Sequence, residues 1–220
     1  MAKNPRQELI RAHYERRVVP GRDSYDVLDW GSREAQLARF HVLVDLLIQH
    51  DLAGTETATC QLLDVGCGLT DLCDLLDRLG LEVAYTGADI VSAILAEARR
   101  RHPERNLVQA DIFQREPFAA RTFDVVFCSG TFNLEVGNNE TFAQHALLTM
   151  LPLVRDCLVA NFLHTRTPRK YEHCHYYDPQ ALMSGVRDRA VKIDVIDNYL
   201  ENDFTLVLWR QNPAVARRRF

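Results

Sequence analysis

Short apolar runs alternate with segments of helical periodicity along most of this chain, and this alternation limits the fold more than any other feature. The expected strands cover residues 62–65, 83–88, 107–109, 123–129 and 158–163. The segments at 72–79, 92–101 and 142–154 carry apolar side chains at helical spacing. Strands separated by helices predict an α/β fold in which helices cover both faces of a parallel sheet.

The last part of the chain breaks this alternation. A helix is expected over residues 178–189, with Pro179 in its first turn. Two β-like runs follow, at 191–196 and 204–209. The connection between them is too short for a crossover helix, so these strands can pair only as an antiparallel hairpin. The sequence therefore predicts a three-layer αβα sandwich with a seven-stranded, mostly parallel sheet that ends in an antiparallel hairpin.

The N-terminal part has a helical pattern that precedes the first strand. One helix is expected over residues 5–18, up to a Pro20-Gly21 turn, and a second is capped by Ser32 and closed by Gly54. Residues 24–31 between them are expected to form a loop. We therefore expect residues 1–58 to form a helical extension of a core at residues 59–220, the two together making one structural domain.

A glycine turn follows the first expected strand, in the run Leu-Leu-Asp-Val-Gly-Cys-Gly-Leu-Thr-Asp-Leu at residues 62–72. Gly66 and Gly68 lack the Cβ atoms that would keep the backbone away from a ligand at the carboxyl edge of the sheet. A tight strand-to-helix turn also needs glycine for packing. The turn alone therefore indicates a nucleotide-like cofactor only in combination with other features.

Two acidic residues end the next two expected strands. Asp89 lies about 20 residues beyond the glycines, where a carboxylate accepts hydrogen bonds from both hydroxyls of a ribose. Asp111 can accept a hydrogen bond from the exocyclic amine of adenine, and Ile90 and Ile112 offer apolar faces to the ring. The alternatives are that Asp89 caps the following helix and that Asp111 is an ordinary turn residue.

These strand-end motifs resemble, in order, those of the class I S-adenosylmethionine-dependent methyltransferase family. The resemblance covers roughly residues 61–210 and implies a Rossmann-like sheet, S-adenosylmethionine as cofactor and methyl transfer by in-line displacement at the sulfonium. It also implies a set of cofactor-binding residues: Asp64, Gly66 and Gly68 at the methionine part, Asp89 at the ribose, Asp111 and Ile112 at the adenine, and in addition Cys67, Ile90 and Ser129. The family often has a third glycine where this chain has Thr70, and a threonine narrows the turn there.

A further resemblance, to an uncharacterised bacterial subgroup that acts on small molecules, rests on shorter motifs. They are Trp-Gly-Ser at 30–32, Arg-Phe at 39–40, Ser-Gly-Thr-Phe-Asn at 129–133 and Asn-Phe-Leu at 161–163. This resemblance implies that the N-terminal helices form a lid over the cofactor. It also implies that Arg39 binds the methionine carboxylate through a bidentate ion pair. The alternative is a solvated arginine on a helix.

The acceptor site is less clearly written in the sequence. The methyl carbon of a sulfonium is already electrophilic, so the protein must mainly align a nucleophile and exclude water. Candidate acceptor-pocket residues follow the fourth and fifth strands; they are Asn133, His164, His173, His175 and Tyr176. A histidine among them can take a proton from a hydroxyl or amine of the acceptor. His173 and His175 are expected on one side of an extended segment. The cluster lacks a recognised metal-ligand spacing, so no metal is predicted.

Composition and missing motifs narrow the partners. A net charge of -4 disfavours a nucleic-acid partner. No apolar stretch is long enough to span a bilayer, no signal peptide is recognisable, and the cysteines form no Cys-x-x-Cys pair. These features predict a cytoplasmic protein without a membrane partner. The acceptor motifs of methyltransferases that modify nucleic-acid amines, cytosine C5 or protein arginine are lacking, which leaves a small molecule.

Two other functions stay open at this stage. One is a module that binds S-adenosylmethionine without catalysis, since a fold does not determine a function. The other is an NAD(P)-dependent oxidoreductase, which shares the glycine turn and the ribose acid. That class expects glycine where this chain has Asp71, and it expects no terminal hairpin. The sequence does not predict the acceptor, the methylated atom or the oligomeric state.

Overall fold

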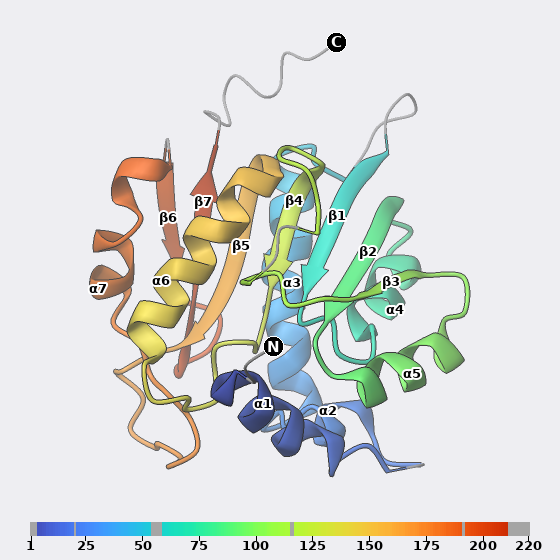
Figure 1. Cartoon of the computed structure of the whole chain (residues 1–220). Coiled ribbons are helices and arrows are strands. Elements are labelled where there is room, and N and C mark those ends of the chain that lie inside the picture. Colours follow the sequence, from blue (N-terminus) through green and yellow to red (C-terminus); the bar gives the residue numbers. More distant parts are fainter. Residues whose placement is uncertain (1–3, 20, 54–58, 115–116, 191, 211–220) are drawn as a thin grey trace.

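The computed structural model describes residues 4–19, 21–53, 59–114, 117–190 and 192–210. Within them, seven strands form one sheet in the order β3-β2-β1-β4-β5-β7-β6 (Figure 1). The strands are β1 Cys60–Val65, β2 Val83–Asp89, β3 Asn106–Gln109, β4 Phe123–Cys128, β5 Val154–Leu163, β6 Lys192–Ile196 and β7 Asp203–Trp209. Strands β1 to β5 are parallel, and β7 pairs antiparallel with both β5 and β6. The predicted sheet and its terminal hairpin are confirmed.

Helices cover both faces of this sheet, as the alternating pattern predicts. The α-helices are α1 Pro5–Glu15, α2 Ser24–Val27, α3 Arg33–Gln49, α4 Asp71–Arg78, α5 Ser92–Arg101, α6 Asn139–Met150 and α7 Pro179–Ser184. Apolar side chains of α3, α4 and α5 form one core with the sheet, and those of α6 and α7 form a second core on its other face. The three-layer αβα sandwich is therefore confirmed (Figure 1).

Two predicted helices in the second half end earlier than expected. Helix α6 ends at Met150 and a short 3-10 turn, Leu151–Leu153, leads directly into β5. Val154, which was predicted to continue the helix face, is therefore the first residue of the strand. Asp178 caps α7, because its Oδ1 accepts a hydrogen bond from the Gln180 N–H at 2.7 Å. That helix ends at Ser184, before Gly185, and a separate 3-10 turn follows at Arg187–Arg189.

The N-terminal helices divide into two groups. Helix α3, capped by Ser32 as predicted, packs Phe40, Leu43 and Leu47 against the sheet and belongs to the sandwich. Helices α1 and α2 lie across the carboxyl ends of the parallel strands instead (Figure 1). Helix α2 occupies part of the segment predicted as a loop, and that prediction is wrong. Pro20 and Gly54, which were predicted to end the first and second helices, lie outside the described residues.

Two properties bear on the surroundings of the protein. Across the described ranges, no helix combines the length and apolar character that crossing a bilayer requires. The six cysteines are unpaired, and five of them are buried.

Candidate functional site

A cavity of about 400 Å³ lies at the carboxyl ends of the parallel strands. Its floor is formed by the loops after β1, β2, β3 and β4, and its roof by residues of α1 and of the turn after α2. The segment 169–176, which follows β5 and is called the covering segment below, closes one side. This size and position are typical of small-molecule sites in α/β proteins.

Most of the residues predicted to bind a cofactor line this cavity. They are Arg39, Gly66, Gly68, Asp89, Ile90, Asp111, Ile112 and Ser129. Asp64 and Cys67 do not contribute to its wall. Topology explains the result, because parallel strands bring their carboxyl ends to one edge of the sheet.

The glycine turn has the left-handed backbone that glycine favours, with φ of +74° at Gly66 and +56° at Gly68. A Cβ atom on Gly66 would lie 2.2 Å from Thr131 Oγ1, and one on Gly68 would lie 2.7 Å from Leu28 Cδ1. Protein side chains therefore fill the space next to both glycines. Packing within the protein therefore requires glycine at both positions, as the alternative explanation of the turn assumed. Gly66 and Gly68 also line the cavity.

Asp64 and Cys67 are buried beneath the turn. The Tyr85 hydroxyl donates a hydrogen bond of 2.8 Å to Asp64 Oδ2. Burial raises the pKa of Asp64 to about 7, against the opposing effect of that hydrogen bond. Burial also raises the pKa of the Cys67 thiol. Thr70, where the family often has glycine, is buried with a left-handed φ of +67° and does not line the cavity.

Asp64→Asn is expected to flatten the pH dependence of stability. The folded-state pKa of about 7 lies above the ordinary value of 3.8 for an aspartate. The stabilisation from the protonated carboxyl is therefore complete at low pH and is lost as the pH rises through about 7. Asparagine has no such proton. Between about pH 5 and about pH 8, the unfolding free energy of the wild type should therefore fall by on the order of 2 kcal/mol more than that of the variant. Urea unfolding across this range measures the difference, and parallel curves for the two proteins would refute it.

Asp89 connects two elements of the cavity floor. Its Oδ2 accepts a hydrogen bond from the Gly68 N–H at 3.2 Å, and its Oδ1 accepts one from the Val91 N–H at 2.9 Å. Burial raises the pKa of Asp89, and these backbone hydrogen bonds lower it. The N-cap residue of α5 is Val91, so Asp89 is not the helix cap that was considered as an alternative.

Asp111 faces helix α1. Its Oδ1 accepts a hydrogen bond from the Phe113 N–H at 2.9 Å, which is the local contact expected of a turn aspartate. Its Oδ2 accepts one from Gln7 Nε2 at 2.6 Å and lies 3.8 Å from Arg6 Nη2. Asp111 thus combines a turn role with a place in the cavity wall, and α1 covers the end of the cavity predicted to hold adenine.

Two buried polar atoms in the cavity wall have no hydrogen-bond partner among the described residues. They are Ser129 Oγ and Trp30 Nε1. Unsatisfied buried groups are rare in folded proteins, and a ligand is one way to satisfy them. The Trp30 ring lies against Gly130, where a Cβ atom would come within 2.6 Å of Trp30 Cη2.

Arg39 lies in the cavity wall with its charge already paired. Its guanidinium forms an ion pair with the buried Asp203 and lies 4.7 Å from the centroid of the Trp30 ring. Its Nη1 also donates a hydrogen bond of 2.6 Å to the Ala35 carbonyl. Arg39 is only 4% exposed, because α3 packs on the sheet, so the alternative of a solvated arginine is wrong.

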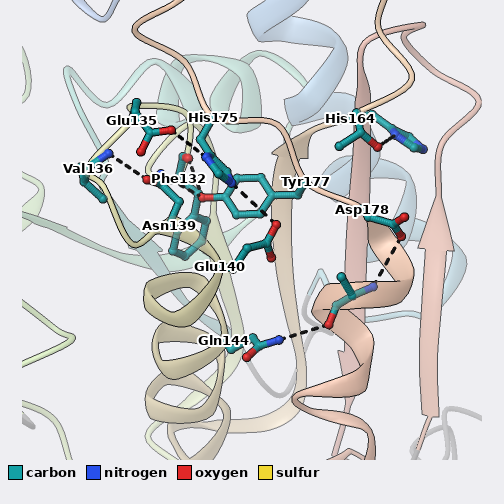
Figure 2. A network of polar contacts seen from close by, with 12 residues as sticks. Phe132, Glu135, Val136, Asn139, Glu140, Gln144, His164, His175, Tyr177 and Asp178 are labelled. Atoms are coloured by element: carbon teal, nitrogen blue, oxygen red, sulfur yellow. Dashed lines mark hydrogen bonds and ion pairs between the residues drawn. The ribbon is translucent and has the colours of Figure 1, made fainter.

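The candidate acceptor residues divide between two places. Asn133, His173 and Tyr176 line the cavity, whereas His164 and His175 do not. Figure 2 shows His175 between two glutamates, with Nδ1 2.8 Å from Glu135 Oε2 and Nε2 3.6 Å from Glu140 Oε1.

The prediction that His173 and His175 share one side is wrong. The Cys174 N–H donates to the Tyr171 carbonyl at 3.0 Å, so the chain turns there instead of being extended. Among the residues with described positions, no group of three or more His, Cys, Asp or Glu side chains is arranged to hold a metal ion.

Helix α1 and the turn after α2 contribute cavity residues that the sequence motifs did not predict. Ile10, His13 and Tyr14 line the cavity from α1, and Asp29 lines it from the turn after α2. The first three have the spacing of one helix face, which is the signal that identifies them as a group. Nothing in their sequence indicates which surface that face covers.

Comparisons with known proteins agree with this geometry. Residues 63–146 match the family model of the methyltransferase domain. No curated protein matches the chain. Magnesium protoporphyrin IX methyltransferase from Synechocystis PCC 6803, solved with bound S-adenosylhomocysteine, superposes with a TM-score of 0.66 at 13% identity, over 94% of this chain and 100% of that one.

Two further structures have similar values. The N-methyltransferase NodS from Bradyrhizobium japonicum, in complex with S-adenosylhomocysteine, has a TM-score of 0.63 at 17% identity and covers 96% of this chain and 100% of that one. Geranyl diphosphate C-methyltransferase from Streptomyces coelicolor has a TM-score of 0.60 at 12% identity, over 94% and 99%. At such identities the likeness concerns the fold.

Proposed function

We propose that this chain is a class I S-adenosylmethionine-dependent methyltransferase that transfers a methyl group from S-adenosylmethionine to a small molecule. The match of residues 63–146 to the methyltransferase-domain model and the shared fold support this proposal. One observation carries the proposal. The cavity at the carboxyl edge of the sheet is lined by Asp89 and Asp111 and holds two buried polar atoms, on Ser129 and Trp30, without partners among the described residues.

The residues of the cavity suit the parts of this cofactor. Asp89 is buried and ends β2, so it would hold the ribose hydroxyls, and Asp111 after β3 would accept the adenine amine. Ile90 and Ile112 would flank the ring with apolar atoms. When bound, the cofactor supplies an electrophilic methyl group on a sulfonium.

The methionine end would lie near β1 and β4. We propose that Ser129 Oγ and Trp30 Nε1 hydrogen-bond polar groups of the methionine part and that Arg39 faces its carboxylate. Asp203 would hold the Arg39 guanidinium in place, which limits its freedom before any ligand binds. Asp64 and Cys67 would act from beneath, by supporting the glycine turn.

The acceptor would bind on the side of the cavity formed by Asn133, His173 and Tyr176. A histidine at this position can take a proton from a hydroxyl or an amine as the methyl group is transferred. His164 and His175 lie outside the cavity wall, so they would act only through the covering segment. Helices α1 and α2 and the turn that follows α2, together called the lid below, would exclude water and align the two reactants.

A small molecule is the acceptor class that the cavity favours. The lid and the covering segment enclose about 400 Å³, and the net charge of -4 gives no general attraction to a nucleic acid. Two of the similar structures are named for small-molecule acceptors, magnesium protoporphyrin IX and geranyl diphosphate. The proposal includes a cytoplasmic location, without a membrane partner.

Isothermal titration of the wild-type protein tests the cofactor. We expect saturable binding of S-adenosylmethionine and S-adenosylhomocysteine, with no binding of NAD or NADP. Binding of NAD alone would replace this proposal with an oxidoreductase. Transfer of a radiolabelled methyl group to members of a small-molecule panel then separates an enzyme from a module that only binds the cofactor.

A further inference from the structure

Asp29 lies where two separate parts of the cavity enclosure meet. His13 on α1 places Nε2 2.8 Å from Asp29 Oδ2. His173 on the covering segment places Nε2 3.6 Å from the same oxygen. The two imidazole rings are stacked, with centroids 6.1 Å apart and planes at 23°. All three side chains line the cavity, so they form one cluster at its rim.

The backbone of Asp29 has a left-handed conformation that favours glycine. The Asp29 N–H donates to the Asp26 carbonyl at 3.2 Å, and the Trp30 N–H donates to the Tyr25 carbonyl at 2.8 Å. This pair of hydrogen bonds is the Schellman pattern that ends a helix, and its left-handed position is usually glycine. Asp29 adopts φ of +60° there, a backbone conformation that is strained for a residue with a side chain. A strained position that has a side chain facing a cavity indicates a role for that side chain.

The charge of Asp29 is shared between the lid and the covering segment. Arg17 Nη2 lies 2.7 Å from Asp29 Oδ1, which leaves Oδ2 to the two histidines. Arg17 also donates to the Asp26 carbonyl at 2.7 Å, so it belongs to the lid. His13 and Arg17 are near Asp29 in the sequence, whereas His173 follows β5. Two contacts in this cluster therefore connect distant parts of the chain, the ion pair between Asp29 and His173 and the stacking of His13 on His173.

We propose that Asp29 is a positioning residue that holds the lid and the covering segment together and so closes the cavity over the bound cofactor. The inference rests on the proposed function. Asp29 acts through His13 and His173, while recognition of the cofactor is left to the strand-end residues such as Asp89. Loss of the Asp29 carboxylate should therefore speed the release of S-adenosylhomocysteine more than it slows its association.

Asp29→Asn tests this directly, because asparagine tolerates the left-handed conformation and removes only the charge. Stopped-flow fluorescence can follow release, since Trp30 lines the cavity and the other tryptophan, Trp209, is buried in the sheet. We expect the dissociation rate of S-adenosylhomocysteine to rise about tenfold, a change of about 1.4 kcal/mol. His173→Ala should have a similar effect, and the double variant should release no faster than either single variant, because both break one connection.

Asp26→Asn is the matched control. Asp26 lies in α2, just before the turn that holds Asp29, and is outside the cavity wall. It pairs with Arg22 at 3.0 Å and with Arg17 at 3.7 Å but has no ion pair with His173, so its loss tests the lid without the connection to the covering segment. Its release rate should equal that of the wild type. An equal acceleration in Asp26→Asn would overturn the inference, as would an unchanged rate in both Asp29→Asn and His173→Ala. Failure of the wild type to bind S-adenosylhomocysteine would refute the proposed function itself, and the inference with it.

Discussion

Asp89→Ala is expected to weaken the binding of S-adenosylmethionine and S-adenosylhomocysteine about 100-fold, or about 3 kcal/mol. The carboxylate is buried and would accept hydrogen bonds from the ribose, and hydrogen bonds to a charged group contribute about 1.5 to 3 kcal/mol each. The substitution also removes the acceptor of the Gly68 N–H, so the turn loses one of its hydrogen bonds to the end of β2 and keeps those of Gly66 and Cys67 to the Ala88 carbonyl. Isothermal titration at one pH and salt concentration gives both affinities.

Asp188→Ala is the control for this experiment, because Asp188 is exposed in a 3-10 turn and does not line the cavity. Its affinities should match those of the wild type. A thermal unfolding curve for Asp89→Ala distinguishes lost binding from lost folding. Wild-type affinity in a folded Asp89→Ala protein would contradict the assignment of Asp89 to the ribose.

Gly66→Ala is expected to lower the free energy of unfolding by about 3 to 5 kcal/mol. The new Cβ would lie 2.2 Å from Thr131 Oγ1, and alanine at φ of +74° adds backbone strain. Thr131 cannot move away freely, because its hydroxyl donates a hydrogen bond of 3.1 Å to the Val65 carbonyl. Urea unfolding of the purified variant measures the loss.

Two variants separate the steric cost from the backbone cost. Gly137 has φ of +89°, and a Cβ atom added there would have no other atom within 4 Å, so Gly137→Ala should cost only about 1 kcal/mol. Thr131→Ala removes the clashing hydroxyl, so adding Gly66→Ala to it should also cost only about 1 kcal/mol. If the added cost stays as large as in the wild type, steric conflict with Thr131 is not the cause.

The sequence was informative about the fold because the pattern is local and the topology follows from it. Alternating strands and helices leave few arrangements, and the short connection before β7 leaves only a hairpin. Helix α2 could not be predicted in the same way. It ends at Val27, and the left-handed position that follows its C-cap is occupied by Asp29 instead of glycine, so the usual stop signal is missing.

The same contrast holds for the candidate site. Strand-end residues such as Asp89 and Asp111 were predictable, because all parallel strands end at one edge. The lid residues were not, because their place depends on how α1 packs across that edge. The glycines gave an ambiguous signal, and the structure resolves part of it: Thr131 and Leu28 occupy the space that their missing Cβ atoms leave. Asp64 shares the motif but lies beneath the cavity.

The reversed direction of β7 has a practical consequence for handling the protein. Because β7 runs antiparallel to β5, its first residue, Asp203, lies opposite Leu163 at the cavity edge, and its last, Trp209, lies opposite Cys157 at the far edge. Arg210 thus follows the strand on the side remote from the cavity. Asn4, in contrast, directly precedes α1 of the lid (Figure 1). A dye or surface anchor is therefore best attached at Arg210, which follows the strand at the edge of the sheet remote from the lid.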